Sequence, residues 1–195
     1  MTSLRRWMGI CAALAWFFAS APATARAQTG GAASTAARDT GRVAARAVDV
    51  ASEDAIVAAQ YDLISGPAGP RDWNRLRSLV TPGAKIVFSV TGADGAVTFR
   101  EVPVETFIAT NGPYLMSHAW WEREVARRSQ RFGSIVQVFS TYEARGTAAG
   151  PAVERGIDAM QLVKHDGRWW IANLLVERES PTLRIPPEYL SGTTP

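Results

Sequence analysis

Amide side chains interrupt the apolar faces of several predicted strands. Residues two apart in a strand share a face, which places Gln137, Gln161 and Asn173 among apolar neighbours. Gln60 likewise falls on the apolar stripe of a predicted helix. A mostly apolar cavity with a few hydrogen-bonding groups is typical of small-molecule sites, so we expect these four amides to line a ligand pocket. The alternative is that each amide satisfies a buried backbone group or lies under a subunit contact.

Aromatic side chains add to this ligand hypothesis. Tyr61, Trp121 and Tyr142 could stack on a ligand, although aromatic residues at such spacing also build cores. We count Tyr61 and Trp121 with the amides as ligand-binding candidates. The expected ligand is a small hydrophobic or aromatic molecule.

Two carboxylates share one face of a predicted strand. Glu122 and Glu124 alternate there with Arg123, and paired carboxylates suggest acid–base chemistry or a metal. We favour a solvated strand face whose Glu and Arg side chains pair across the sheet. The sequence has no HExxH motif, Gly-rich phosphate loop or GxSxG elbow. We therefore predict no metal and no cofactor.

The elements that would position these residues begin with helices and continue as strands. Ser52 is a suitable N-cap for a helix that Gly66-Pro67 ends, and Asp72 caps a second helix. Asp166-Gly167 between apolar runs is the strongest hairpin signal. The predicted helices are 53–65, 72–79 and a short one from Pro103 that Asn111-Gly112-Pro113 closes; the predicted strands are 84–90, 96–100, 120–130, 134–145, 155–164 and 168–176. This order indicates an α+β domain with an antiparallel meander.

The first 27 residues have the features of a cleavable signal peptide. A basic start at Arg5 and Arg6 is followed by the apolar run 7–21 and by Ala25-Arg26-Ala27, which predicts cleavage after Ala27. A membrane anchor is the alternative, but the run is shorter than a bilayer span. The expected location is periplasmic or secreted, by either the general or the twin-arginine route.

Composition narrows the classes of partner for the remaining chain. Three of the 21 basic residues lie in the signal segment, so the rest are balanced against 18 acidic residues, and no nucleic acid is expected. No membrane contact is expected after cleavage. The lone cysteine, Cys11, also lies in the signal, which leaves no disulfide or thiol nucleophile. The predicted organisation is a flexible leader at 28–50, a domain at 51–190 and a tail at 191–195.

Four stretches of the sequence resemble the nuclear transport factor 2-like superfamily, and its bacterial SnoaL-like branch in particular. They are FGSIVQVFSTYEAR at 132–145, the RGI strand start at 155–157 with DGRWWIANLL at 166–175, and the terminal IPPEYL at 185–190. The resemblance covers about residues 50–190. It implies a cystatin-like α+β roll, a cone-shaped curved antiparallel sheet wrapped around the N-terminal helices. Its members include ketosteroid isomerases, polyketide cyclases and dehydratases, so the fold alone names no reaction.

The enzymes of this superfamily use an Asp or His in the cone as a general base, with a Tyr or an acid that stabilises an enolate. By that resemblance the weak catalytic candidates are His118, Tyr61 and Asp62. Our first hypothesis is nevertheless an exported small-molecule-binding domain without an assignable reaction. The alternatives are an acid–base enzyme of the isomerase, cyclase or dehydratase type, and a protein-interaction module. Because several strands are apolar on both faces, we also expect a homodimer, unless the leader covers the outer face.

Overall fold

The computed structural model describes residues 43–191, and the signal segment and most of the leader lie outside this range. The elements in chain order are η1 (Ala47–Asp49), α1 (Glu53–Ile64), α2 (Trp73–Leu79), β1 (Val80–Thr91), β2 (Val97–Pro103), α3 (Val104–Ser117), β3 (Trp121–Phe132), β4 (Ile135–Arg145), β5 (Ala152–His165), β6 (Arg168–Arg178) and η2 (Pro187–Tyr189). Within residues 43–191, no helix is long and apolar enough to cross a membrane.

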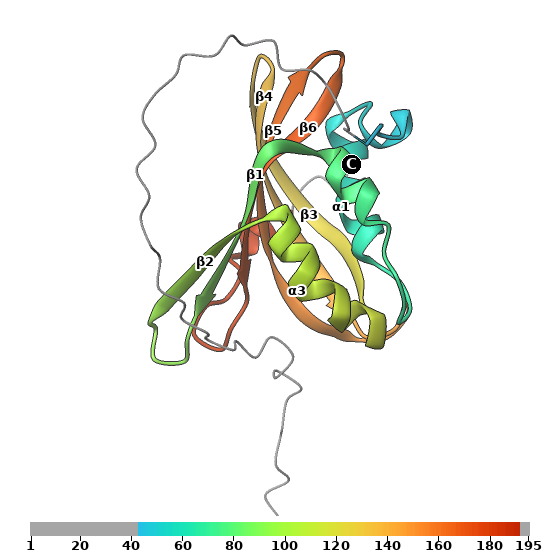
Figure 1. Ribbon diagram of the computed structural model, residues 1–195. Helices are drawn as coiled ribbons and strands as arrows, with labels where there is room; N and C mark the ends of the chain where they lie inside the picture. Colours follow the sequence, from blue (N-terminus) through green and yellow to red (C-terminus); the bar gives the residue numbers. More distant parts are fainter. Residues whose placement is uncertain (1–42, 192–195) are drawn as a thin grey trace, which may run out of the picture. The chain divides into compact units, whose positions relative to one another are not determined.

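Six strands form one strongly curved sheet in the order β2-β1-β6-β5-β4-β3 (Figure 1). The pairs from β3 to β6 are antiparallel, as the meander predicts. The pair β1–β6 is parallel, so the sheet is not purely antiparallel. The hairpin of β1 and β2 extends the meander at its β6 edge, where β1 pairs with β6. The predicted α+β roll is thereby confirmed, with this one change in strand direction.

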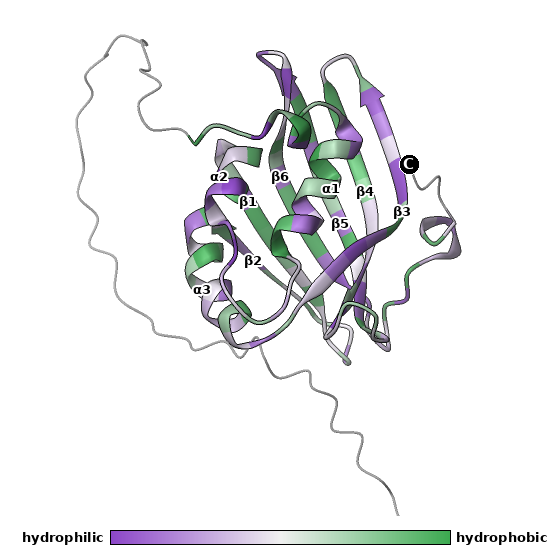
Figure 2. Cartoon of the chain, turned by 90° about the vertical axis from the view of Figure 1, so that its right-hand side faces the viewer, coloured by the Kyte–Doolittle hydropathy of each residue, from purple (hydrophilic) through white to green (hydrophobic). Residues whose placement is uncertain are grey.

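The helices cover one face of the sheet, which we call the inner face (Figure 2). The side chains of Ile56 and Val57 on α1 are fully buried, and so are Val138 on β4 and Met160 on β5. These residues belong to one continuous apolar core. The expected N-caps are confirmed, because Ser52 accepts from the Ala55 amide and Asp72 from the Arg75 amide, both at 3.0 Å.

Two predicted boundaries differ from the structure. The third helix does not end at Asn111-Gly112-Pro113 but continues to Ser117. Gly112 lies within this helix and faces the Trp73 ring, where a Cβ atom would lie 3.6 Å from Nε1, an ordinary contact distance. The folded part also begins before residue 51. Val50 is only 5 % exposed, and its carbonyl accepts from the Trp169 amide at 3.0 Å.

Candidate functional site

Four carboxylates gather on the inner face of β3, β4 and β5. The register pairs Ser140 with Asp158 and Tyr142 with Glu124, while Ala144 pairs with both Glu122 and Glu154. Directly paired residues point to the same face of a sheet, and Ser140 contacts Tyr61 of α1. The four therefore share the helix-covered face, and we call them the acidic cluster: Glu122, Glu124, Glu154 and Asp158.

Arginine neutralises two members of the acidic cluster. Arg127 donates to both Glu124 oxygens, at 2.7 and 2.6 Å, in the bidentate geometry that makes such pairs strong. Glu154 accepts from Arg178 at 3.2 Å and from the Tyr142 hydroxyl at 2.9 Å. Both carboxylates thus have a cationic partner.

The other two members, Glu122 and Asp158, make no ion pair within residues 43–191. Asp158 is 4 % exposed, and Glu122 keeps a partly accessible surface. The indole of Trp120 donates to Glu122 at 2.8 Å. A buried carboxylate without a cation is costly, because burial disfavours its charged form. These two groups are therefore the unusual part of the site.

Burial and the charges of neighbouring carboxylates raise the pKa of both acids. Burial is the main cause that raises the pKa of Asp158 well above its usual value, and the charge of Glu122 adds to it. Burial also raises the pKa of Glu122 to about 7, with a contribution from Glu154, while the Trp120 hydrogen bond opposes the rise. An acid with a pKa near neutrality, such as Glu122, can both release and accept a proton, which is the property that acid–base catalysis needs.

Two tyrosines border the acidic cluster. Tyr61 of α1 donates to Ser140 at 2.8 Å, and burial raises the pKa of both Tyr61 and Tyr142 well above the usual range. Both hydroxyls therefore remain protonated. No three His, Cys, Asp or Glu side chains in the described part of the chain are arranged to hold a metal ion. The chemistry that these groups offer is hydrogen bonding and proton transfer.

The structure brings only part of the predicted ligand set to the inner face. Tyr61 lies there, and Gln60 is buried on the same helix. Gln137, Gln161 and Asn173 do lie side by side, since the register pairs Gln161 with both of the others. Their face is the outer one, however, because they alternate with the buried inner-face residues. The expectation that these three amides line the interior is therefore wrong.

The outer-face amides bind to one another and to the backbone. Asn173 donates to Gln161 at 3.0 Å and accepts from the Lys85 amide at 3.2 Å. Trp121 alternates with Glu122 and so also lies away from the inner face. These contacts agree with the alternative in which amides satisfy backbone groups. A ligand role for these side chains stays a prediction that no contact here supports.

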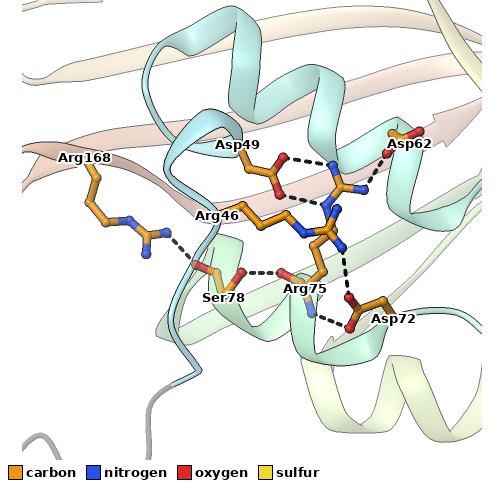
Figure 3. A network of polar contacts seen from close by, with 7 residues as sticks. All are labelled: Arg46, Asp49, Asp62, Asp72, Arg75, Ser78 and Arg168. Carbon is orange, nitrogen blue, oxygen red and sulfur yellow. Dashed lines mark hydrogen bonds and ion pairs between the residues drawn. The ribbon is translucent and has the colours of Figure 1, made fainter.

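Two of the three catalytic candidates lie outside the acidic cluster. His118 is exposed; its ring stacks on Tyr114 at 4.3 Å and its Nδ1 lies 3.0 Å from the Tyr114 carbonyl oxygen. The Asp62 side chain is 71 % exposed. It pairs with Arg75, which also binds the buried Asp49 through two hydrogen bonds (Figure 3). This network fastens η1 to α1 and α2, so Asp62 has a structural contact.

Glu122 and Glu124 differ from their predicted role as solvated strand residues. Both face the helices, and Glu124 has a side chain only 12 % exposed. Asp158 and Glu154 were not among the predicted site residues. The sequence does contain one indication for Asp158: in the alternation of β5 it shares a face with Gly156 and Met160, which are small or apolar. Since both faces of that strand are apolar, alternation alone did not indicate which face points inward.

A surface hollow of about 290 Å³ lies beside the loop that follows α1. Arg71 closes this loop by donating to four backbone carbonyls, those of Ile64, Gly66, Pro67 and Gly69. None of the lining residues belongs to the acidic cluster. The hollow is therefore a feature of the loop and separate from the candidate site.

The sequence matches no protein-family model and no curated protein. Solved structures are similar in fold. A nuclear transport factor 2-like protein of unknown function from Methylobacillus flagellatus KT is 16 % identical, with 66 % of this chain and 95 % of that chain covered and a TM-score of 0.43. A protein from Parabacteroides distasonis, named provisionally as a ketosteroid isomerase, is 10 % identical over 65 % and 87 % of the chains, with a TM-score of 0.43.

A third similar structure, from Nostoc punctiforme, is described as having a cystatin-like fold and unknown function. It is 15 % identical, with 57 % of this chain and 79 % of that chain covered and a TM-score of 0.40. Likenesses of this degree concern the fold, and no activity follows from them. The solved structures that this chain is similar to thus include one described as a nuclear transport factor 2-like protein, and the SnoaL-like branch stays a prediction.

Proposed function

We propose that this protein binds a small, mainly apolar molecule against the inner face of the sheet and moves a proton on it with the acidic cluster. The supporting observation is the pair Glu122 and Asp158, two covered carboxylates on one face without a cation. Structural carboxylates inside proteins are normally paired. A pair left unneutralised has the character of a site that holds and releases a proton.

The two acids have different roles in this proposal. Glu122 is partly accessible, and the Trp120 indole fixes one of its oxygens at 2.8 Å. It is the group that contacts the ligand and exchanges the proton. Asp158 lies deeper, and the charge of Glu122 raises its pKa, so that Asp158 retains a proton more readily when Glu122 is ionised. The inner face that they share is otherwise apolar, with core residues such as Val138 and Met160, and this favours an apolar ligand body.

Carbon acids next to a carbonyl group are the substrates for which one acid–base pair suffices without a cofactor. The test incubates residues 28–195 in D₂O with a panel of cyclic ketones, enones and β-keto esters. Loss of the α-proton signal is followed by ¹H NMR. We expect at least one compound to exchange faster with the protein than in buffer. Glu122→Gln should slow this exchange by about 100-fold or more, the usual contribution of a general base.

Glu105→Gln is the matched control, because Glu105 is an exposed glutamate that pairs with Arg77 away from the acidic cluster. It should leave the exchange unchanged. A panel in which compounds raise the melting temperature but none exchanges would contradict proton transfer and favour binding alone. Equal losses in both glutamate variants would contradict the role given to Glu122.

The outer face supports a second candidate, a homodimer formed through the sheet. Ile135 is 56 % exposed and Leu175 45 % exposed, and exposed apolar side chains gathered on one sheet face mark interaction surfaces. Light scattering coupled to size exclusion would measure the mass. We expect a dimer that Leu175→Asp converts to a monomer with unchanged circular dichroism. A monomeric wild type would contradict this candidate.

We also propose that the chain is exported and cleaved after Ala27, as its N-terminal pattern predicts. Mass spectrometry of the protein recovered from the periplasm of an expressing bacterium would show a chain that begins at Gln28. A full-length chain retained in the cytoplasm would contradict export.

A further inference from the structure

The end of the described chain lies on the outer face of the sheet. Residues 184–191, which we call the C-terminal strap, follow β6 and include η2. The Tyr189 ring stacks on Phe139 of β4, with ring centroids 5.7 Å apart. The Thr141 hydroxyl of the same strand donates to the Tyr189 carbonyl at 2.6 Å. Phe139 and Thr141 flank the inner-face residue Ser140, so the surface that the strap covers is the outer one.

The strap covers one end of an apolar row that crosses the outer face. The register pairs Phe139 with Ala159 of β5, and Ala159 with Leu175 of β6. These three side chains therefore lie next to one another on the same face. The strap contacts the Phe139 end, where Thr141 is only 1 % exposed, whereas Leu175 at the other end is open to solvent. One continuous apolar surface is thus divided into a covered part and an open part.

Few side chains hold the C-terminal strap in place. Ile185 is buried and Tyr189 partly so, while the other side chains of the strap are exposed. The hydrogen bonds from the sheet go to main-chain carbonyls of the strap, as in the bond of 2.5 Å from Arg128 of β3 to the Glu188 carbonyl. The strap contributes no strand to the sheet of residues 43–191. A segment with so few buried contacts opens at low cost, so the strap can leave the sheet without unfolding it.

The outer face around this row suits a second copy of the same chain. The next row consists of the three outer-face amides described above, which carry no charge. An uncharged surface with apolar side chains can face its own image without repulsion, as a two-fold symmetric contact requires. The small side chain of Ala159 between Phe139 and Leu175 also leaves space for a large side chain from the other copy.

We propose that the C-terminal strap is a cover that keeps a second copy of this chain off the β3–β4 part of the outer face. The strap and the second copy compete for the same side chain, Phe139. When the strap leaves, the row from Leu175 to Phe139 becomes one surface, and association gains the uncovered apolar area. The choice of a second copy as the occupant rests on the outer-face homodimer proposed above.

The test compares the mature chain, residues 28–195, with a shortened chain that ends at Leu183 and so lacks the strap. Light scattering coupled to size exclusion measures the mass at equal concentrations, and circular dichroism checks the fold. We expect the shortened chain to have at least twice the mass of the mature chain. Phe139→Asp in the shortened chain should restore the lower mass, because the charge falls at the uncovered end of the row. A folded shortened chain of unchanged mass would overturn the proposal, and so would a mass that stays raised with Phe139→Asp.

Tyr189→Asp in the mature chain is the second variant, and it decides if the shortened chain does not fold. The new charge lies against Phe139 and lifts the strap, so the mass should rise in the same way; no rise would overturn the proposal. Leu190→Asp is the matched control, because it places the same charge on an exposed side chain of the strap and should leave the mass unchanged. An unchanged mass with stronger binding of a hydrophobic dye would show that the covered surface fits a different partner, which also overturns the proposal.

The failure of this proposal and that of the homodimer are distinguishable. If the mature chain is a monomer, the homodimer fails, but the shortened chain should still form a dimer. If the mature chain is a dimer that Leu175→Asp separates, the shortened chain should form a tetramer or a larger assembly. A mature dimer whose mass does not change on shortening would keep the homodimer and reject the role of the strap.

Discussion

The pKa of Glu122 makes a specific prediction about stability and pH. An ordinary glutamate titrates near 4.5, and Glu122 in the fold near 7. Between these values the folded state keeps the proton while the unfolded state releases it. Ionisation then favours unfolding, and stability falls by about 1.4 kcal/mol for each pH unit. Below pH 4.5 both states are protonated and the penalty is absent; above pH 7 it is complete, at about 3 kcal/mol.

Glu122→Gln removes this penalty and retains an oxygen that accepts from the Trp120 indole. The free energy of unfolding, measured with urea from pH 4.5 to 8, should rise in the variant relative to the wild type as the pH increases. The difference should grow by up to about 3 kcal/mol and level off above pH 7. Glu105→Gln should show no such rise, because the hydrogen bond from Arg77 lowers the pKa of Glu105, and a lowered pKa makes the wild type more stable, not less, as the pH increases. A constant difference between Glu122→Gln and the wild type would refute the assigned burial of the carboxylate.

Three further substitutions test the packing around the site, each by urea denaturation at a fixed pH. Gly156→Ala should cost about 1–3 kcal/mol through overpacking, since its Cβ would lie 2.6 Å from the backbone oxygen of Glu177 and 2.7 Å from Cε1 of Tyr142; an unchanged stability would show that the backbone and the ring can both move aside. Ser52→Ala should cost about 1 kcal/mol by removing the α1 cap, and no loss would mean that water replaces it. Asp49→Ala should cost about 3 kcal/mol because it leaves Arg75 without its buried partner; a loss below 1 kcal/mol would contradict the importance of that ion pair.

The fold was largely predictable because its local signals agree with its tertiary contacts. The caps Ser52 and Asp72 start their helices as expected, and Asp166-Gly167 forms its turn with both residues at positive φ. The extension of α3 past Gly112 was not predictable, because Asn-Gly-Pro locally favours a chain break and the helix nevertheless continues to Ser117. The parallel pair β1–β6 was also hidden, since strand neighbours across the sheet leave no local pattern.

The site was less predictable, because identifying it requires knowing which face of each strand points toward the helices. On β4 both faces carry apolar residues, so the pattern made Gln137 and Ser140 equally suitable to face the core. The contact that decides is the hydrogen bond from Tyr61 to Ser140, which joins residues 79 positions apart. Because side chains alternate with a period of two, choosing the wrong face for a strand places all of its inner side chains outside and all of its outer side chains inside. The sequence pattern therefore places the three amides inward and Glu122 and Glu124 outward.

The pairing within the acidic cluster is itself an argument for function. This chain places Arg127 against Glu124 and Arg178 against Glu154, so its fold has the means to neutralise an inner-face carboxylate. It does not do so for Glu122 or Asp158, although a glutamine or asparagine of nearly the same shape would avoid the cost of burial. Departures from favourable packing that are confined to one place, with well-paired neighbours around them, are typical of functional sites. The cost at Glu122, about 3 kcal/mol at pH 8 by the linkage above, is large against a usual stability of about 5–15 kcal/mol. A residue with only a structural role would not be expected to keep it.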